Sequence, residues 1–221
     1  MRLAYVALLM ALACDSTPIV AEAPTADAEP VGPGLPVDHP PIELAPESHA
    51  PKRLTVDMLQ ASLPVIAGVD AAGAPITWTI QRNQRQVDAL SDEGLGRTLG
   101  RPDYVQITEE AAEPTPLYAK LVDDMARDVC TKMIRADDAR AASARTLTRL
   151  APLDGAEVAE VQANLRYLML RFLGQKVADD DVAATADLLT LYDAASGGTD
   201  ARAGWTAVCV GLLVSPSFHL Y

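Results

Sequence analysis

The chain contains few of the residues that usually carry chemistry. Three of its 221 residues are histidine, three are cysteine and 5% are aromatic. His219 is the only histidine that we place in the folded part, which excludes a multi-histidine metal site and favours an ordinary surface position for this residue near the C-terminus. The sequence also lacks G-x-S-x-G, H-E-x-x-H, G-x-x-x-x-G-K-[ST] and G-x-G-x-x-G. We therefore expect no catalytic, cofactor-binding or metal-binding residues, while leaving open whether the protein is an enzyme.

Positive charge is scarce. The chain has 18 Lys and Arg against 30 Asp and Glu, which gives a formal net charge of -12 and an isoelectric point near 4.6. A surface with this balance repels phosphate backbones and anionic lipid headgroups. We therefore expect no nucleic-acid partner and no binding to the membrane through its headgroups.

Residues 1–14 have the pattern of an export signal. Met1-Arg2 is a short basic start, and an apolar run follows from Leu3 to Leu12. This run is shorter than the roughly 20 residues that cross a bilayer. The stretch from Ala11 to Cys14 resembles a bacterial lipoprotein signal, with Ala11 where leucine is usual, which implies lipidation at Cys14. The alternative is an ordinary secretory signal with an unlipidated cysteine. Either reading predicts an extracytoplasmic protein, and lipidation would anchor it to the inner or outer membrane of a bacterial envelope.

Residues 15–51 have the composition of a spacer. They contain nine prolines and seven acidic residues, and neither Lys nor Arg. Such a segment cannot bury enough apolar surface to offset the entropy of ordering it, so we predict a disordered tether. His39 and His49 lie in this tether, where a metal site is not expected.

Residues 52–221 are rich in alanine and leucine, and we predict a mainly α domain of five to six helices with at most one short strand or hairpin. The clearest feature is a final buried helix that Asp200 caps and Ser215-Pro216 ends. The other helices are expected over 56–63, 116–134, 138–150, 157–173 and from Asp179 to the glycines at 197 and 198. A strand is expected over 76–80, and 81–101 should form an irregular surface segment. The core face of the final helix comprises Trp205, Val208, Cys209, Leu212 and Leu213.

Cys130 and Cys209 are the cysteines that remain after Cys14. Both lie on apolar helix faces of a protein that we expect to be exported, and an even pair in an oxidising compartment favours a disulfide. The alternative is two separate buried thiols that act as small hydrophobic side chains.

Four arginines lie close together in this acidic chain: Arg82, Arg85, Arg97 and Arg101. They form a candidate surface for binding a partner or an anion. The alternative is charge that keeps the protein soluble.

Several structural motifs resemble helical modules of unknown function in large exported proteins of planctomycetes and myxobacteria. Those modules often accompany c-type cytochrome domains, but this chain has no C-x-x-C-H for covalent haem and has Gln175 where arginine is usual. The resemblance implies a helical fold over about residues 52–221 and carries no chemistry to any residue. The matching elements are Leu54-Thr55, Leu99-Gly100-Arg101-Pro102-Asp103-Tyr104, Leu168-x-x-x-Phe172-Leu173-Gly174-Gln175-x-x-x-x-x-Asp181 and Trp205-x-x-x-Cys209-x-x-Leu212-Leu213-x-Ser215-Pro216-x-Phe218-x-x-Tyr221.

Two functional hypotheses follow. The first is a lipid-anchored accessory protein without catalysis of its own, which docks onto a larger exported or envelope protein and through the resemblance onto a cytochrome-associated one. The second is an enzyme or redox component of such a system, with the arginines lining a cleft. A stand-alone structural envelope protein is a third hypothesis.

Overall fold

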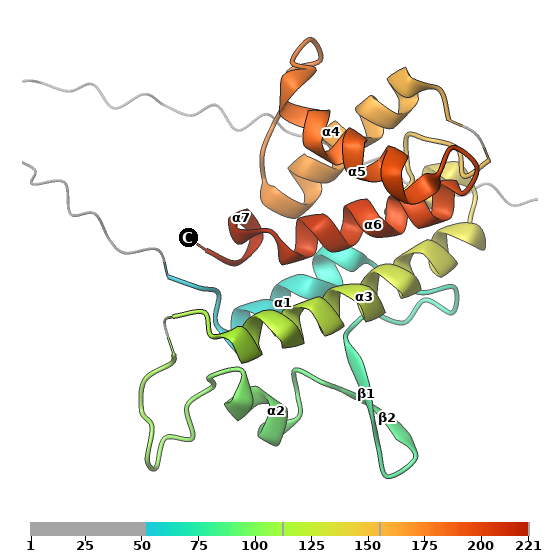
Figure 1. The fold of residues 1–221 in the computed structure, drawn as a ribbon. Coiled ribbons are helices and arrows are strands. Elements are labelled where there is room, and N and C mark those ends of the chain that lie inside the picture. Colours follow the sequence, from blue (N-terminus) through green and yellow to red (C-terminus); the bar gives the residue numbers. More distant parts are fainter. Residues whose placement is uncertain (1–51, 112, 155, 221) are drawn as a thin grey trace, which may run out of the picture. The chain divides into compact units, whose positions relative to one another are not determined.

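A computed structural model describes residues 52–111, 113–154 and 156–220 (Figure 1). The predicted signal at 1–14, with its lipidation site Cys14, and the predicted tether at 15–51 lie outside the described residues. Within the described ranges no helix is both long enough and apolar enough to cross a membrane.

The described residues are mainly helical, as the sequence predicts. They form seven α-helices, more than the expected five to six, and one two-stranded hairpin. The extra helices are short ones at 93–98 and 216–219. In chain order the elements are α1 (Val56–Ala67), β1 (Thr79–Arg82), β2 (Arg85–Asp88), α2 (Glu93–Thr98), α3 (Pro116–Asp138), a 3-10 turn (Ala142–Ala144), α4 (Val158–Leu173), a second 3-10 turn (Ala183–Thr185), α5 (Ala186–Ser196), α6 (Ala201–Val214) and α7 (Pro216–His219).

Helix α6 is the centre of the fold. Figure 1 shows it between α3 on one side and α4 and α5 on the other, and it contacts all three. Asp200 caps it by accepting a hydrogen bond from the backbone of Ala203. Its predicted core face is fully buried, and burial stabilises the fold by roughly 1.5–3 kcal/mol for each large aliphatic side chain. The prediction of a buried final helix is therefore confirmed.

A disulfide joins α3 to α6. Cys130 of α3 and Cys209 of α6 lie 79 residues apart in sequence, with a Cα–Cα distance of 5.8 Å. This pairing confirms the predicted disulfide. It fixes α3 against α6, so the face that these two helices share is held by a covalent bond.

The hairpin was only partly predicted. The expected strand at 76–80 lies at 79–82, and it pairs antiparallel with 85–88 inside the segment that was expected to be irregular. Asn83 and Gln84 form the turn, with φ of 48° and 63°. Two successive positive φ angles are typical of a two-residue hairpin, but glycine usually takes the second position. Because Gln84 occupies the second turn position, the Asn-Gly pattern that usually predicts such a hairpin is missing from the sequence.

The predicted helix over 138–150 is wrong. The carboxylate of Asp137, at the end of α3, accepts hydrogen bonds from the backbone N–H groups of Thr146, Leu147 and Thr148 at 2.7–2.8 Å. Asn164 of α4 holds the same segment through the carbonyl of Leu147. These side chains bind backbone groups that a helix would have used internally, and the segment therefore follows an irregular path.

Candidate functional site

The four arginines of the predicted binding surface lie in two places. Arg82 and Arg85 face each other at the end of the hairpin, while Arg97 lies on α2 and Arg101 follows it. Three of the four contact a carboxylate. These ion pairs are Arg82 with Asp92 at 2.8 Å, Arg97 with Glu93, and Arg101 with Asp57 at 2.7 Å. An anion that bound here would have to compete with these carboxylates. The three paired arginines therefore already make ion pairs within the domain.

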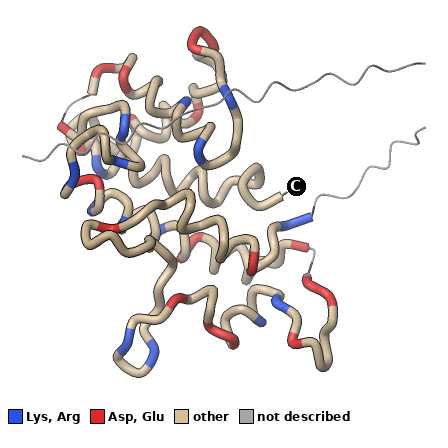
Figure 2. The backbone as a smooth tube through the Cα atoms, turned by 180° about the vertical axis from the view of Figure 1, so that it is seen from behind, with Lys and Arg blue, Asp and Glu red and all other residues tan. Residues whose placement is uncertain are grey.

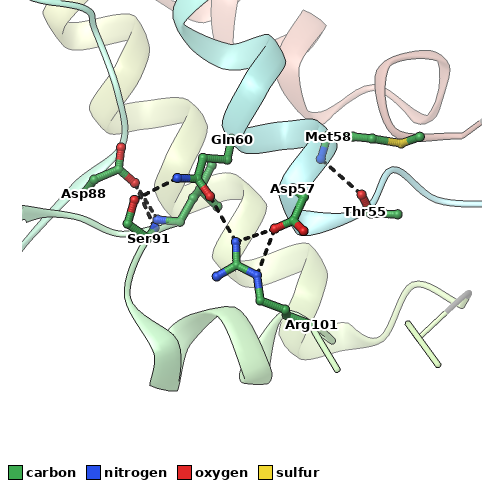
Figure 3. Close-up of polar contacts among 8 residues, drawn as sticks. Thr55, Asp57, Met58, Gln60, Asp88, Ser91 and Arg101 are labelled. Atoms are coloured by element: carbon green, nitrogen blue, oxygen red, sulfur yellow. Dashed lines mark hydrogen bonds and ion pairs between the residues drawn. The ribbon is translucent and has the colours of Figure 1, made fainter. Parts of the chain in front are cut away.

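Arg101 is part of a polar network that connects α1 to the segment around α2 (Figure 3). Its guanidinium donates to Asp57 Oδ1 at 3.0 and 2.7 Å and to Gln60 Oε1 at 3.0 Å. Gln60 in turn donates to Ser91 Oγ at 2.8 Å, and the N–H of Ser91 donates to Asp88. Nε and Nη2 of Arg101 both donate to acceptors on α1. We therefore assign Arg101 a structural role, which is to hold α2 against α1.

Arg53, Tyr118 and His219 form a second cluster, where the described chain begins and ends. The Arg53 guanidinium carbon lies 4.4 Å from the Tyr118 ring centroid, in a cation–π arrangement. Tyr118 Oη is 3.0 Å from Nδ1 of His219, and Nε2 of His219 is 2.6 Å from the carbonyl oxygen of Leu213. Because a carbonyl only accepts, Nε2 carries the proton and Nδ1 accepts from the tyrosine.

His219 is not a surface residue as expected, because only 5% of it is exposed. Burial lowers its pKa below the ordinary value of 6.5, the Leu213 carbonyl opposes this change, and the nearby Arg53 charge adds to it. Both ring nitrogens are already bonded to protein groups. His219 therefore has no nitrogen to offer a metal or a substrate in this arrangement, and no cluster of three or more potential metal ligands occurs among residues 52–111, 113–154 and 156–220.

Two adjoining hollows run beside α3 and α6. The larger has a volume of about 790 Å³ and lies between Asp123 and Arg127 of α3 and the small residues of α6, with Leu191 of α5 at its edge. The smaller has a volume of about 310 Å³ and lies at Tyr118 and His219. Asp123 and Val214 line both, so the two hollows meet.

Three large apolar side chains of the loop between α2 and α3 are strongly exposed. Tyr104 is 71% exposed, Val105 85% and Ile107 60%. We refer to residues 103–107 as the Tyr104 loop. Single exposed apolar residues are common on protein surfaces, but here three large ones occur within four positions, and clusters of exposed apolar residues often mark binding sites.

The Tyr104 loop is held in one conformation by Asp103. Its Oδ1 atom accepts hydrogen bonds from the N–H groups of Val105, Gln106 and Ile107 at 3.0, 2.8 and 2.9 Å. These bonds lower the pKa of Asp103 to about 2. The N–H of Tyr104 donates to the carbonyl of Ile107 at 3.0 Å, and Tyr104 has a φ of 56°. A positive φ is unfavourable for tyrosine, so the surrounding bonds impose this backbone conformation.

Acidic residues flank the apolar tip. Asp103 precedes it, and Glu109, Glu110 and Glu113 follow it. Figure 2 shows this as a tan loop tip with red on both sides. Desolvation and the neighbouring charge of Asp57 raise the pKa of Glu110, while Arg53 and Arg101 lower it. The loop therefore presents an apolar tip that acidic residues flank along the chain, with Arg53, Arg97 and Arg101 close to these acids.

Sequence reasoning missed the Tyr104 loop. Its three apolar residues follow neither a helical nor a strand period over a useful length, and their exposure is decided by the fold. The one available signal was Asp103, because aspartate often binds the backbone two to four residues later and so begins a turn.

No protein-family model, no curated protein and no solved structure matches this chain. The resemblance to helical modules of exported proteins therefore stays a prediction.

Proposed function

We propose that the protein is an exported, lipid-anchored accessory protein whose domain docks onto a larger envelope protein through the Tyr104 loop. The observation that carries this proposal is the exposure of Tyr104, Val105 and Ile107 on a loop whose backbone is hydrogen-bonded to Asp103. Burying the valine and the isoleucine in a partner would contribute roughly 1.5–3 kcal/mol each. Tyrosine is among the residues that most often dominate binding energy at interfaces.

The conformation of the loop favours binding. A flexible loop loses conformational entropy when a partner orders it, and this loss weakens the complex. The N–H groups of residues 105–107 are hydrogen-bonded to Asp103 without any partner, and these bonds would reduce that loss. The loop would therefore lose less conformational entropy on binding than a loop without these bonds.

Charge specifies the chemistry of the partner. An apolar tip among Asp103, Glu109, Glu110 and Glu113 is complementary to an apolar socket with Lys or Arg at its rim. The net charge of -12 would also steer the whole protein toward a basic surface and make association faster at low salt. We propose such a socket on the larger partner. The same acids disfavour insertion of the loop into an anionic bilayer.

The anchor and tether extend this proposal. Lipidation at Cys14 would hold the protein at the envelope, and 37 tether residues at roughly 3 Å each would give the domain a reach of up to ~100 Å. A partner would then be within reach over a wide area of membrane. Replacement of Cys14 by Ser is expected to release the protein from the membrane fraction. A protein that stays in that fraction would contradict the anchor.

Site-specific photo-cross-linking in native envelopes tests the docking surface. A benzophenone amino acid at position 105 is expected to give one discrete adduct with a larger protein. The same amino acid at position 65, another strongly exposed valine on α1, is the matched control and should give no such adduct. Absence of an adduct at position 105, or an adduct with lipid alone, would overturn the proposal.

The alternative function is an enzyme or redox component of a cytochrome-associated system. The structure offers it no specific support, because three of the predicted arginines contact carboxylates and both nitrogens of His219 are bonded. A visible spectrum of the cross-linked partner would distinguish a haem protein from a colourless one, and so would test the cytochrome association separately from docking.

A further inference from the structure

Arg53 holds the base of the loop that carries Tyr104. The two ends of residues 100–111 meet where the N–H of Ala111 donates to the carbonyl of Gly100 at 3.2 Å. The Nε–H group of Arg53 donates to the carbonyl of Ala111. Gly100 leaves no room for a Cβ atom between its backbone and the Arg53 guanidinium, and Arg53 itself is buried. The position of this loop base therefore depends on where the guanidinium lies.

The same arginine is also connected to His219. Its guanidinium carbon lies 4.4 Å from the centre of the Tyr118 ring, and the hydroxyl of Tyr118 is 3.0 Å from Nδ1 of His219. The backbone adds a second connection, because Arg53 pairs with Leu220 in an antiparallel bridge and the N–H of Leu54 donates to the carbonyl of His219 at 2.7 Å. Arg53 thus joins the loop base to a buried titratable ring.

The surroundings of His219 favour its neutral form. Of the described residues, the charged and titratable groups that face it are Arg53 and, from α3, Tyr118 and Asp123, which lines the same hollow. From α6, the carbonyl of Leu213 accepts from the Nε2–H group. Burial lowers the pKa of His219, the Leu213 carbonyl opposes this change, and the Arg53 charge lowers the pKa further.

Protonation would reverse the bond between His219 and Tyr118. Nδ1 would carry a proton, so the hydroxyl of Tyr118 would lose its acceptor. A second positive charge would also arise near Arg53 in a buried place, where charges repel more strongly than in water. We propose that protonation of His219 displaces Arg53 from the carbonyl of Ala111 and so opens the base of the loop. The consequence, weaker docking under mildly acidic conditions, rests on the proposed function.

Amide hydrogen exchange of the full chain tests the proposal without a partner. Protection of the Ala111 N–H group, relative to an unstructured peptide at the same pH, is expected to fall about fivefold or more between pH 7.5 and 5.0. Protection of the Leu147 N–H group, which the buried Asp137 binds elsewhere in the domain, should change less. Unchanged protection of Ala111 would overturn the proposal. So would an equal fall at Leu147, because it would indicate global unfolding.

The matched control is His219→Gln, which keeps a donor and an acceptor but does not titrate in this range. Its Ala111 protection should be the same at both pH values, and a fall as large as in the native chain would contradict a role for His219.

A second measurement does not depend on the folding of this variant. Coupling between Arg53 and His219 is reciprocal, so Arg53→Met should make the ring bind its proton about threefold or more tightly in an NMR titration. An unchanged proton affinity would overturn the proposal.

Cross-linking from position 105 separates this regulation from the proposed function. The yield of the adduct is expected to fall about threefold or more from pH 7.5 to 5.0 with the native His219, and to stay constant with His219→Gln. Equal yields at both values with the native chain would overturn the regulation of docking. Absence of the adduct at both values would instead reject docking through the Tyr104 loop, and amide exchange alone would then decide whether His219 controls the loop base.

Discussion

The carboxylate of Asp103 accepts a hydrogen bond from the backbone N–H of Ile107 at 2.9 Å, four residues along the chain. This contact closes the Tyr104 loop and turns three large apolar side chains toward solvent. Asp103 itself need not touch a partner. Its contribution would be to restrict the loop to one conformation, and this can be separated experimentally from the contribution of the side chains at the tip.

Replacement of Asp103 by Ala is expected to weaken partner binding about fivefold to tenfold, because the loop must then be ordered on binding. Asp103→Asn, which keeps an acceptor oxygen, should retain most of the affinity. Recovery of the cross-linked partner from envelopes measures both. The pKa of Asp103 is lowered from 3.8 to about 2, so its contribution is fully present above pH 4 and is lost as pH falls through about 2. A loss of binding already between pH 8 and 6 would therefore have another cause.

Replacement of Tyr104 by Asn is expected to abolish most of the binding while leaving the domain as stable as before. Asparagine adopts positive φ more readily than tyrosine, so the loop keeps its conformation. The loss of the ring should cost tenfold or more in affinity, as at other interfacial tyrosines. Urea unfolding and partner recovery on the same preparation separate the two effects. Unchanged recovery would remove Tyr104 from the interface.

His219 makes the stability of the domain depend on pH. Its pKa in the folded state lies below 6.5, so its contribution is fully present above pH 6.5 and decreases as pH falls toward the folded pKa. His219→Gln should be less stable at pH 7.5 by about 1–3 kcal/mol, since a buried hydrogen bond is lost. Its free energy of unfolding should change less than that of the native chain between pH 7.5 and 5.5. Parallel urea titrations at both values measure this, and identical pH dependence would show that His219 does not titrate in this range.

The disulfide should contribute strongly to stability. It closes a loop of 79 residues, and in the chain-entropy model a loop of this length stabilises the fold by about 4 kcal/mol. Replacing both Cys130 and Cys209 by Ala is expected to lower the free energy of unfolding by that order. A reductant should destabilise the native chain and have no effect on the double variant. A native chain that is insensitive to full reduction would contradict this expectation.

The sequence predicted those parts of the fold that depend on local signals. Asp200 and Gly174 mark helix ends in both sequence and structure, because capping needs only neighbouring residues. The face of α6 and the pairing of its cysteine also followed from periodicity and from the even number of cysteines. These features can be predicted without knowing which residues, distant in sequence, pack against them.

Features that depend on distant contacts could not be predicted in this way. Asp137 is a charged residue near the end of a helix, yet it is buried and binds the backbone of residues 146–148. Leu117 at the start of α3 is apolar but exposed, whereas Tyr118 and Val122 are buried. Arg101 was predicted to belong to a binding surface, but it pairs with Asp57 of α1. The candidate site was missed for the same reason, since the exposure of Tyr104 is a property of the folded domain.

The most direct test of the proposed function is a mild-detergent pull-down of the tagged protein from native envelopes, with mass spectrometry of the eluate. Three chains are compared: the native one, a loop variant with Tyr104, Val105 and Ile107 replaced by Ala, and a control with Val65 and Val158 replaced by Ala. Val65 and Val158 are also strongly exposed, but they lie on α1 and α4. We predict one larger partner with the native and control chains, and its loss with the loop variant. Equal recovery with all three chains, or no partner with any of them, would contradict docking through the Tyr104 loop.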